Sequence, residues 1–232
     1  MMPRVRVLFF TFNNRERKMK SLIVSILFLF TTILSAKEWT FEISPRELKM
    51  CGAPNLQRPQ YFVEKCGIKN MVNLSFFTAK TFIPPYKDLE TTNLKNPKKW
   101  PFLTIEGDGF PFIYDGKELT NAEFDIVRKE TKFIASGWPI LMREGRKTRI
   151  RNSFFSRRRC PRTAVGIHPN GSMIVYINTA ATLKQVQDYF ATIGCMDAIN
   201  FDGGSSTFLY LNGEKVFSSN KGKSYPNVLY WN

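Results

Sequence analysis

Residues 182–207 read TLKQVQDYFATIGCMDAINFDGGSST and place a helix pattern, a strand pattern and a glycine-rich turn one after another. Thr182 and Gln185 have the spacing of a capping box, and apolar residues recur at helical intervals until Gly194, which predicts a helix over 182–194. Residues 197–201 then predict a buried strand. Asp202 follows this strand directly, so we expect its carboxylate to emerge at the end of a sheet.

The turn after Asp202 has the composition of an anion or sugar site. Glycines allow a ligand to approach the backbone closely, and the amides of Gly203, Gly204 and Ser205 can form a concave nest for an anion. Three hydroxyl groups that fit a phosphate or a sugar follow, from Ser205, Ser206 and Thr207. The alternative is a tight turn in which Asp202 caps its own backbone. The spacing alone leaves both interpretations open.

The remaining chain is rich in strand patterns and poor in helix patterns. Strands are predicted at residues 39–43, 69–77, 163–167, 172–178, 207–211 and 214–217, and the sequence Pro-Asn-Gly at 169–171 predicts a hairpin turn. Residues 80–101 hold four prolines among many polar residues, which predicts a long surface loop or flap without a helix. We therefore expect an α+β fold with a mixed, mostly antiparallel sheet and few helices, in a single compact domain.

One segment between these strands is strongly basic. Residues 134–141 are apolar with a break at Gly137 and Pro139, and residues 143–159 then carry eight arginines or lysines. This charge run is interpreted either as a solvated loop or as an arm that binds an anion.

Composition excludes several classes of function. The 232 residues are 43% hydrophobic and 23% charged, which is enough apolar material for a buried core. His168 is the single histidine, so metal sites built on several imidazoles and nucleases with two catalytic histidines are excluded. Nucleic-acid binding is not expected, because no motif for it is present.

The amino-terminal residues have the layout of an export signal. Residues 22–34 read LIVSILFLFTTIL, follow Lys18 and Lys20, and precede Ser35 and Ala36. We expect an export signal over 1–36, with Met19 as a possible start, and a periplasmic or secreted protein. The apolar run is shorter than a membrane span, so the membrane is expected as a partner only through an uncleaved signal. Without residues 1–36, which hold six basic side chains and one acidic, the net charge falls from +15 to +10.

The rest of the chain is divided into amino-terminal strands with a cysteine-containing loop at 37–69 and a larger domain at 70–232. In an oxidising compartment the four cysteines can form two bridges, and Cys51 with Cys66 is the preferred local pair because the intervening loop is short. Cys195 is either bridged or a buried thiol. A nucleophilic pair of Cys160 and His168 lacks an orienting third group, so Cys160 is expected to be bridged or buried.

A second motif is Cys160-Pro161-Arg162-Thr163-Ala164-Val165-Gly166. It places Arg162 at the entrance of an apolar strand, where the guanidinium offers a planar fork to a phosphate or carboxylate. Together with the turn after Asp202, this motif belongs to an ordered series that resembles the phosphodiester glycosidase family. The other members are Val72-Asn73-x-x-Phe76-Phe77, Ser136-Gly137-x-Pro139-x-Leu141 with Gly145, Asp197-Ala198-x-Asn200, and Asn227. The chain departs from the family at Ser205, where a third glycine is usual, and in a longer loop at 84–101.

The resemblance implies hydrolysis of a sugar joined through its anomeric oxygen to a phosphodiester, so the expected partner is a sugar-phosphodiester or phosphorylated glycan. It implies Asp202 and Arg162 as catalytic residues. The substrate-binding residues it implies are Asn73, Thr163, Gly203, Gly204, Ser206 and Thr207. Such hydrolysis normally needs a second carboxyl group, and the choice among Glu106, Asp108, Asp125 and Asp197 stays open.

No cofactor is expected and no metal ligand is assigned, although Asp202, Asn200 and backbone oxygens leave calcium or magnesium open. The alternative function is a non-catalytic module that binds anionic glycans or cell-wall polymers through its basic surface and through Trp100 and Trp138.

Overall fold

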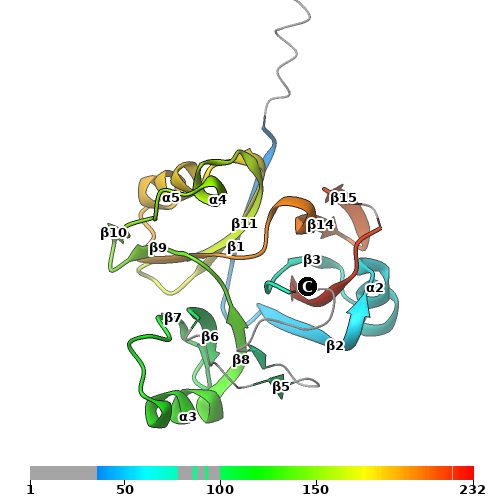
Figure 1. The fold of residues 1–232 in the computed structure, drawn as a ribbon. Coiled ribbons are helices and arrows are strands. Elements are labelled where there is room, and N and C mark those ends of the chain that lie inside the picture. The colour runs from blue at the N-terminus through cyan, green and yellow to red at the C-terminus, as the bar shows by residue number, and fades with distance from the viewer. Residues whose placement is uncertain (1–35, 78–85, 88–91, 94–99, 221) are drawn as a thin grey trace, which may run out of the picture. The chain divides into compact units, whose positions relative to one another are not determined.

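Helix α5, Leu183–Thr192, begins where the sequence predicts it. The hydroxyl of Thr182 accepts a hydrogen bond from the amide of Gln185, and the Gln185 side chain accepts one from the amide of Thr182. Gly194 has a φ of +76°, which ends the helix in the left-handed region. The predicted helix is confirmed, with its buried side packed on the neighbouring sheet (Figure 1).

The computed structural model describes residues 36–77, 86–87, 92–93, 100–220 and 222–232. The chain divides into two units, Met1–Ser35 and Ala36–Asn232, and all described residues belong to the second unit. The predicted export signal lies outside the described residues except for Ala36. Most of the predicted loop at 80–101 also lies outside them.

The second unit contains three antiparallel sheets. Together with the helices, they confirm the predicted α+β class. The first has the strand order β1-β12-β11-β13-β9-β10. Its strands are β1 Glu38–Ile43, β9 Ile140–Arg143, β10 Arg146–Lys147, β11 Cys160–Ile167, β12 Met173–Ala181 and β13 Asp197–Asn200. Strands β11 and β12 form the predicted hairpin, with Ile167 opposite Met173 next to the turn.

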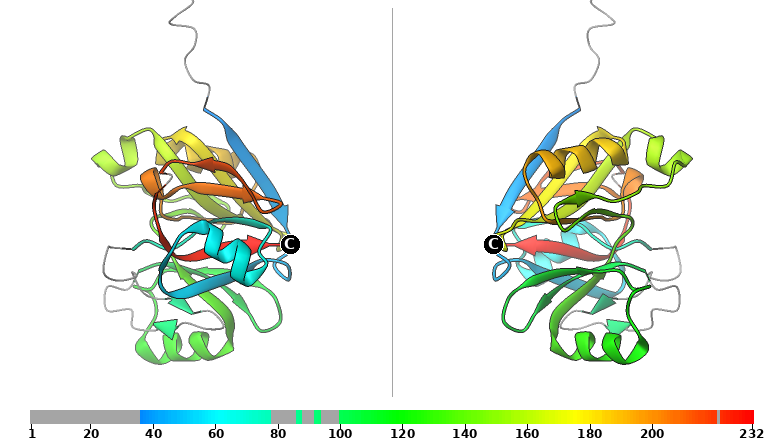
Figure 2. Two further views of the ribbon diagram at one scale, coloured as in Figure 1. Left: turned by 90° about the vertical axis from the view of Figure 1, so that its right-hand side faces the viewer. Right: turned by 90° about the vertical axis from the view of Figure 1, so that its left-hand side faces the viewer.

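The second sheet has the order β15-β14-β3-β16-β2. Its strands are β2 Lys49–Gln57, β3 Asn70–Asn73, β14 Phe208–Leu211, β15 Glu214–Ser218 and β16 Tyr225–Trp231. Strand β16 lies between β3 and β2, so a late segment of the chain fills the middle of a sheet begun by early segments (Figure 2).

The third sheet has the order β5-β4-β8-β6-β7. Its strands are β4 Tyr86–Lys87, β5 Thr92–Asn93, β6 Phe102–Glu106, β7 Pro111–Tyr114 and β8 Thr131–Ser136. The two short strands β4 and β5 fall inside the predicted loop, so that segment contributes an edge to the sheet.

The main core lies where inner faces of all three sheets meet. It contains Val165 and Val175 from the first sheet, Leu229 from the second, and Leu103 and Phe133 from the third, all buried. Helices cover the outer faces in Figure 1: α5 packs on the first sheet, α2 (Pro59–Cys66) on the second and α3 (Asn121–Glu130) on the third.

Two of these helices were not predicted. Helix α3 has a capping box of Thr120 and Glu123, but only Val127 is buried along it, so the apolar period is weak. Helix α2 begins at Pro59 and ends before Gly67, which has a φ of +64°. The short helix α4, Phe154–Arg157, lies in the basic segment that was interpreted as a loop or an arm.

The cysteines are thiols in the structure. Strand β2 and helix α2 occupy the segment that was predicted as a loop, and they bring the Sγ atoms of Cys51 and Cys66 to 3.3 Å, which is longer than a disulfide bond of about 2.05 Å. The predicted bridge is therefore not formed here. Cys195 is buried, and burial raises its pKa to about 12.

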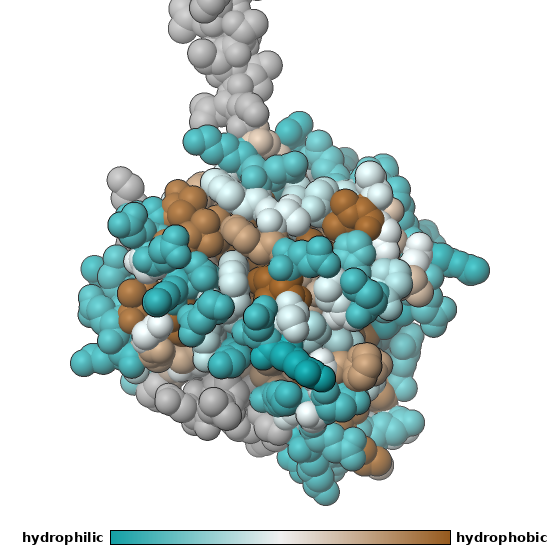
Figure 3. All heavy atoms as spheres, turned by 180° about the vertical axis from the view of Figure 1, so that it is seen from behind, coloured by the Kyte–Doolittle hydropathy of each residue, from teal (hydrophilic) through white to brown (hydrophobic). Residues whose placement is uncertain are grey.

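The surface of the second unit is mainly hydrophilic, with small separate hydrophobic patches on the face shown in Figure 3. Among the described residues, no helix combines the length and apolar character that a bilayer crossing requires.

Candidate active site

Strand β13 delivers Asp202 to a fixed place at the junction of the first and second sheets. Phe201 is buried in the main core immediately before it. The amide of Asp202 donates to the carbonyl of Leu74 at 3.1 Å, and its carbonyl accepts from Nδ2 of Asn73 at 2.6 Å. Both sides of the Asp202 peptide are therefore attached to the end of β3, which leaves the side chain as the part that can take part in chemistry.

The carboxyl group of Asp202 is largely buried, and this burial raises its pKa above the ordinary value. Three weaker interactions act in the opposite direction: a hydrogen bond with the Ser206 side chain, the positive charge of Lys223, and a hydrogen bond from the amide of Gly203 at 3.0 Å. A carboxyl group with a raised pKa beside a cation is a common component of catalytic sites.

Tyr225 is close enough to Asp202 for the two groups to interact electrostatically. Its hydroxyl is buried and has no hydrogen-bond partner within the part of the chain that the structure describes. Burial and the negative charge of Asp202 raise the pKa of Tyr225. The hydroxyl is therefore a neutral donor near the carboxylate.

Lys223 supplies the positive charge of the site. Its Nζ lies 2.5 Å from Oγ of Ser206 and 3.3 Å from Oγ of Ser205, and 4.9 Å from the centre of the Phe77 ring. This lysine was not predicted from the sequence, because it lies in a polar turn without a strand or helix pattern around it.

The turn after Asp202 forms a 3-10 helix, η1, at Gly204–Ser206. The amide of Gly203 is bonded to the Asp202 carboxylate, as in the turn that caps its own backbone. The amides of Ser206 and Thr207 are bonded within the turn. The amides of Gly204 and Ser205 donate to no acceptor among the described residues, so two of the three amides predicted to bind an anion are open.

Gly203 is required by close packing against the neighbouring strand. A Cβ atom there would lie 2.8 Å from the carbonyl oxygen of Pro161 and 3.6 Å from Cδ of Arg162. Gly204 has a φ of +59°, which favours glycine for a different reason.

Arg162 runs against this turn, but its guanidinium is fully buried. Its Nε donates to the carbonyl of Ala181 at 3.2 Å, and Nη2 donates to the carbonyls of Phe155 and Arg158 at 2.7 and 3.0 Å. The ring of Phe155 lies 4.7 Å from the guanidinium carbon. Nη1 is buried without a partner among the described residues, and burial lowers the pKa of the group.

This arrangement gives Arg162 and Asp202 different surroundings, although both were predicted to be catalytic. Most of the guanidinium holds the backbone around α4 and the end of β12, and only Nη1 remains for another acceptor. The carbon chain of Arg162 contacts the turn, whereas the charge nearest to the Asp202 carboxylate comes from Lys223.

Asn73 and Thr163 are buried and bonded to each other, Thr163 Oγ1 donating to Asn73 Oδ1 at 2.7 Å. The same Oδ1 accepts from the amide of Phe208 at 3.3 Å. One amide side chain thus joins β3, β11, β14 and the Asp202 peptide. Ser206 and Thr207 are also buried, and only Ser206 is directed to the Asp202 carboxyl.

The four candidates for a second carboxylate have partners elsewhere. Glu106 accepts from Tyr114, Asp108 from the Phe110 amide, Asp125 pairs with Arg128, and Asp197 pairs with Arg143 at 3.4 Å. None of these interactions involves Asp202. Among the described residues, no three acidic, cysteine or histidine side chains gather at a point that would suit a metal ion.

Cys160 and His168 lie at opposite ends of the eight-residue strand β11 and its turn, roughly 25 Å apart at 3.3 Å per residue. A shared catalytic role for this pair is therefore excluded by the fold.

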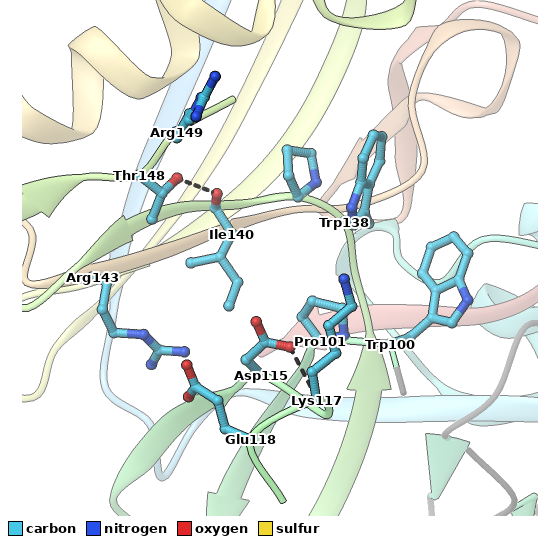
Figure 4. Close-up of a pocket in the computed structure, with 11 residues that line it drawn as sticks. Trp100, Pro101, Asp115, Lys117, Glu118, Trp138, Ile140, Arg143, Thr148 and Arg149 are labelled. Atoms are coloured by element: carbon cyan, nitrogen blue, oxygen red, sulfur yellow. Dashed lines mark hydrogen bonds between the residues drawn. The ribbon is translucent and has the colours of Figure 1, made fainter. Parts of the chain in front are cut away.

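A cavity of about 710 Å³ opens beside the end of β13 (Figure 4). Its lining comprises Trp100, Pro101, Asp115, Lys117, Glu118, Trp138, Pro139, Ile140, Arg143, Thr148 and Arg149. Trp138 connects it to the site, because its amide donates to the carbonyl of Asn200 at 2.7 Å and its carbonyl accepts from Nδ2 of Asn200 at 2.8 Å. Asn200 is two residues before Asp202.

Comparisons with known proteins agree on the fold. The catalytic domain of zebrafish N-acetylglucosamine-1-phosphodiester alpha-N-acetylglucosaminidase, auto-inhibited by its pro-peptide, is similar at a TM-score of 0.67 and 16% identity, covering 85% of this chain and 82% of that chain. A hypothetical protein from Synechocystis is similar at a TM-score of 0.59 and 14% identity, covering 83% of this chain and 58% of that one. The curated proteins include no match. A sequence profile described as phosphodiester glycosidase matches residues 71–231.

Proposed function

The chain belongs to the phosphodiester glycosidase family, and on this premise we propose that it hydrolyses the glycosidic bond of a sugar-1-phosphodiester, with Asp202 at the reacting centre. The observation that carries the proposal is the partly exposed Asp202 carboxyl group with its raised pKa, next to Lys223 and two open amides. A phosphodiester brings one negative charge, and these donors are the groups that would hold it.

In the proposed reaction, water attacks the anomeric carbon and the bond between that carbon and the phosphate oxygen breaks. The phosphate monoester leaves with the electron pair, and the Asp202 carboxylate takes the proton from the attacking water. A raised pKa favours this role, because a more basic carboxylate accepts a proton more readily. Its negative charge also stabilises the oxocarbenium-like transition state.

Lys223 and the amides of Gly204 and Ser205 are assigned to the phosphate. Charge-assisted hydrogen bonds to a leaving phosphate strengthen as negative charge develops on it. Arg162 is assigned a positioning role, because its guanidinium is bonded mainly to backbone carbonyls.

Export to the periplasm or outside the cell is part of the proposal and rests on the apolar run at 22–34.

The decisive experiment is an assay of residues 37–232 on a panel of sugar-1-phosphodiesters, with Asp202→Asn as the inactive variant. We expect release of free sugar by the wild type, loss of at least about a thousandfold in kcat for Asp202→Asn, and unchanged folding by circular dichroism. Absence of release from every member of the panel by a folded wild type would favour the non-catalytic glycan-binding alternative, as would equal rates for the two proteins.

A further inference from the structure

The cavity in Figure 4 has a chemistry that the proposed reaction at Asp202 does not use. Two tryptophans, Trp100 and Trp138, lie at one end of it, whereas Asp115, Glu118 and Arg143 gather at the other. A volume of about 710 Å³ is within the range of small-molecule sites, roughly 300–1,000 Å³. It is large enough for more than one sugar ring.

Each tryptophan packs against a neighbouring aromatic ring and remains partly exposed. Both polar groups of the Trp138 backbone are bonded to Asn200, and its ring lies 5.5 Å from that of Phe155. Trp138 nevertheless keeps 38% of its surface exposed. The Trp100 ring lies 5.7 Å from that of Phe76. Partly exposed indole rings suit the flat apolar C–H face of a pyranose, because stacking removes apolar surface of both partners from water.

At the charged end of the cavity, Arg143 is held by two neighbouring groups. Nη1 of Arg143 contacts the carbonyl of Ile113 and lies 3.4 Å from the Asp197 carboxylate, which directs the guanidinium toward the cavity (Figure 4). Carboxylates accept hydrogen bonds from sugar hydroxyls, and guanidinium groups donate to them. The lining carries charges of both signs, including Lys117 and Arg149, so it suits a ligand with many hydroxyls, which both donate and accept hydrogen bonds.

We propose that this cavity is a carbohydrate-binding subsite, in which sugar rings of an oligosaccharide stack on Trp100 and Trp138 and hydrogen bond to Asp115, Glu118 and Arg143. Its connection through Asn200 to the Asp202 turn makes it the place for the glycan chain of the substrate. That last assignment rests on the proposed function, whereas carbohydrate binding in the cavity does not.

Binding is tested on the Asp202→Asn protein, residues 37–232, so that no turnover occurs. The probes are chitotetraose, cellotetraose and tetragalacturonate, each beside its monosaccharide, followed by tryptophan fluorescence and isothermal titration calorimetry. We expect at least one tetrasaccharide to bind, and to bind more tightly than its monosaccharide. Trp138→Ala should weaken binding about tenfold, and Trp138→Phe, which keeps a ring, should weaken it less.

Phe110→Ala is the matched control, because Phe110 is a 58% exposed aromatic residue outside the cavity lining. The affinity of the Phe110→Ala variant for the tetrasaccharide should equal that of the parent protein. Lack of binding by all three tetrasaccharides, or equal losses in Trp138→Ala and Phe110→Ala, overturns the subsite.

The two proposals fail separately. Oligosaccharide binding without hydrolysis of any sugar-1-phosphodiester by the wild type would leave the subsite in place and remove the reaction. Hydrolysis of a sugar-1-phosphodiester without oligosaccharide binding would support the reaction and overturn the subsite.

Discussion

Asp202 combines a fixed peptide with a side chain whose protonation is tuned by its neighbours. The backbone is held by Asn73 and Leu74, and the carboxyl group interacts with Ser206, Lys223 and the amide of Gly203. Substitutions at these neighbours should therefore change the pKa of Asp202 more than its position.

Lys223→Ala tests this expectation through the pH profile. If Asp202 acts as the base, kcat/KM rises with pH as the carboxyl group ionises, and burial places this acidic limb above the ordinary value of 3.8. The charge of Lys223 lowers the pKa, so its removal should shift the limb further toward higher pH and raise KM for a phosphodiester. Lys223→Arg, which keeps the charge, should keep the limb near that of the wild type. A limb that is unchanged in Lys223→Ala would contradict the proximity of the two groups.

Gly203→Ala tests the packing of the turn. The new methyl group would lie 2.8 Å from the Pro161 carbonyl oxygen, so we expect a loss of about 1–3 kcal/mol in the free energy of unfolding, measured with urea. Ser205→Ala, at an exposed position of the same turn, should change it by less than about 0.5 kcal/mol. Equal stability of Gly203→Ala and the wild type would mean that the backbone of β11 shifts at Pro161 to make room for the new methyl group.

At the scale of elements, the helix and strands with a strong sequence pattern were predicted, and the helices with a weak pattern were not. The capping box and apolar period of α5, the hairpin of β11 and β12, and the strand β13 were all confirmed. The family resemblance was confirmed by the profile that matches residues 71–231. Helices α2 and α3 were missed, because α2 is eight residues long and α3 buries only Val127.

The site shows the same limit. Asp202 at the end of a strand was predicted from local pattern, and so was its glycine-rich turn. The proximity of Lys223 and Tyr225 was not, because it depends on how β16 enters the second sheet, which is a long-range pairing. The burial of the Arg162 guanidinium depends likewise on α4 and the end of β12. The catalytic and substrate-binding roles assigned to individual residues stay predictions.

Thr120→Ala tests the one clear signal of α3 that the sequence offered. The Thr120 hydroxyl accepts from the Glu123 amide, and the Glu123 carboxylate accepts from the Thr120 amide. Loss of this cap should lower the free energy of unfolding by about 1 kcal/mol. Asn121→Ala, at the neighbouring exposed position, is the control and should have a smaller effect. Equal effects of the two substitutions would show that the cap contributes little.

At the scale of the whole molecule, the net charge of +10 for residues 37–232 should attract an anionic substrate over some distance. Since salt shortens the range of such attraction to about 3 Å at 1 M, kcat/KM for a phosphodiester should fall between 0.05 and about 1 M sodium chloride. The stability of the protein should not fall in parallel, which unfolding at both salt concentrations would check. A kcat/KM that is independent of salt would show that the charge plays no part in capture.

Strand β16 has a consequence for biogenesis. It is synthesised after β2 and β3, yet it lies between them, so those two strands cannot be joined into their sheet until it is available. The second sheet can therefore be completed only after residues 225–231 have been synthesised. Until then β2, which pairs in this sheet with β16 alone, has backbone N–H and C=O groups without their sheet partners.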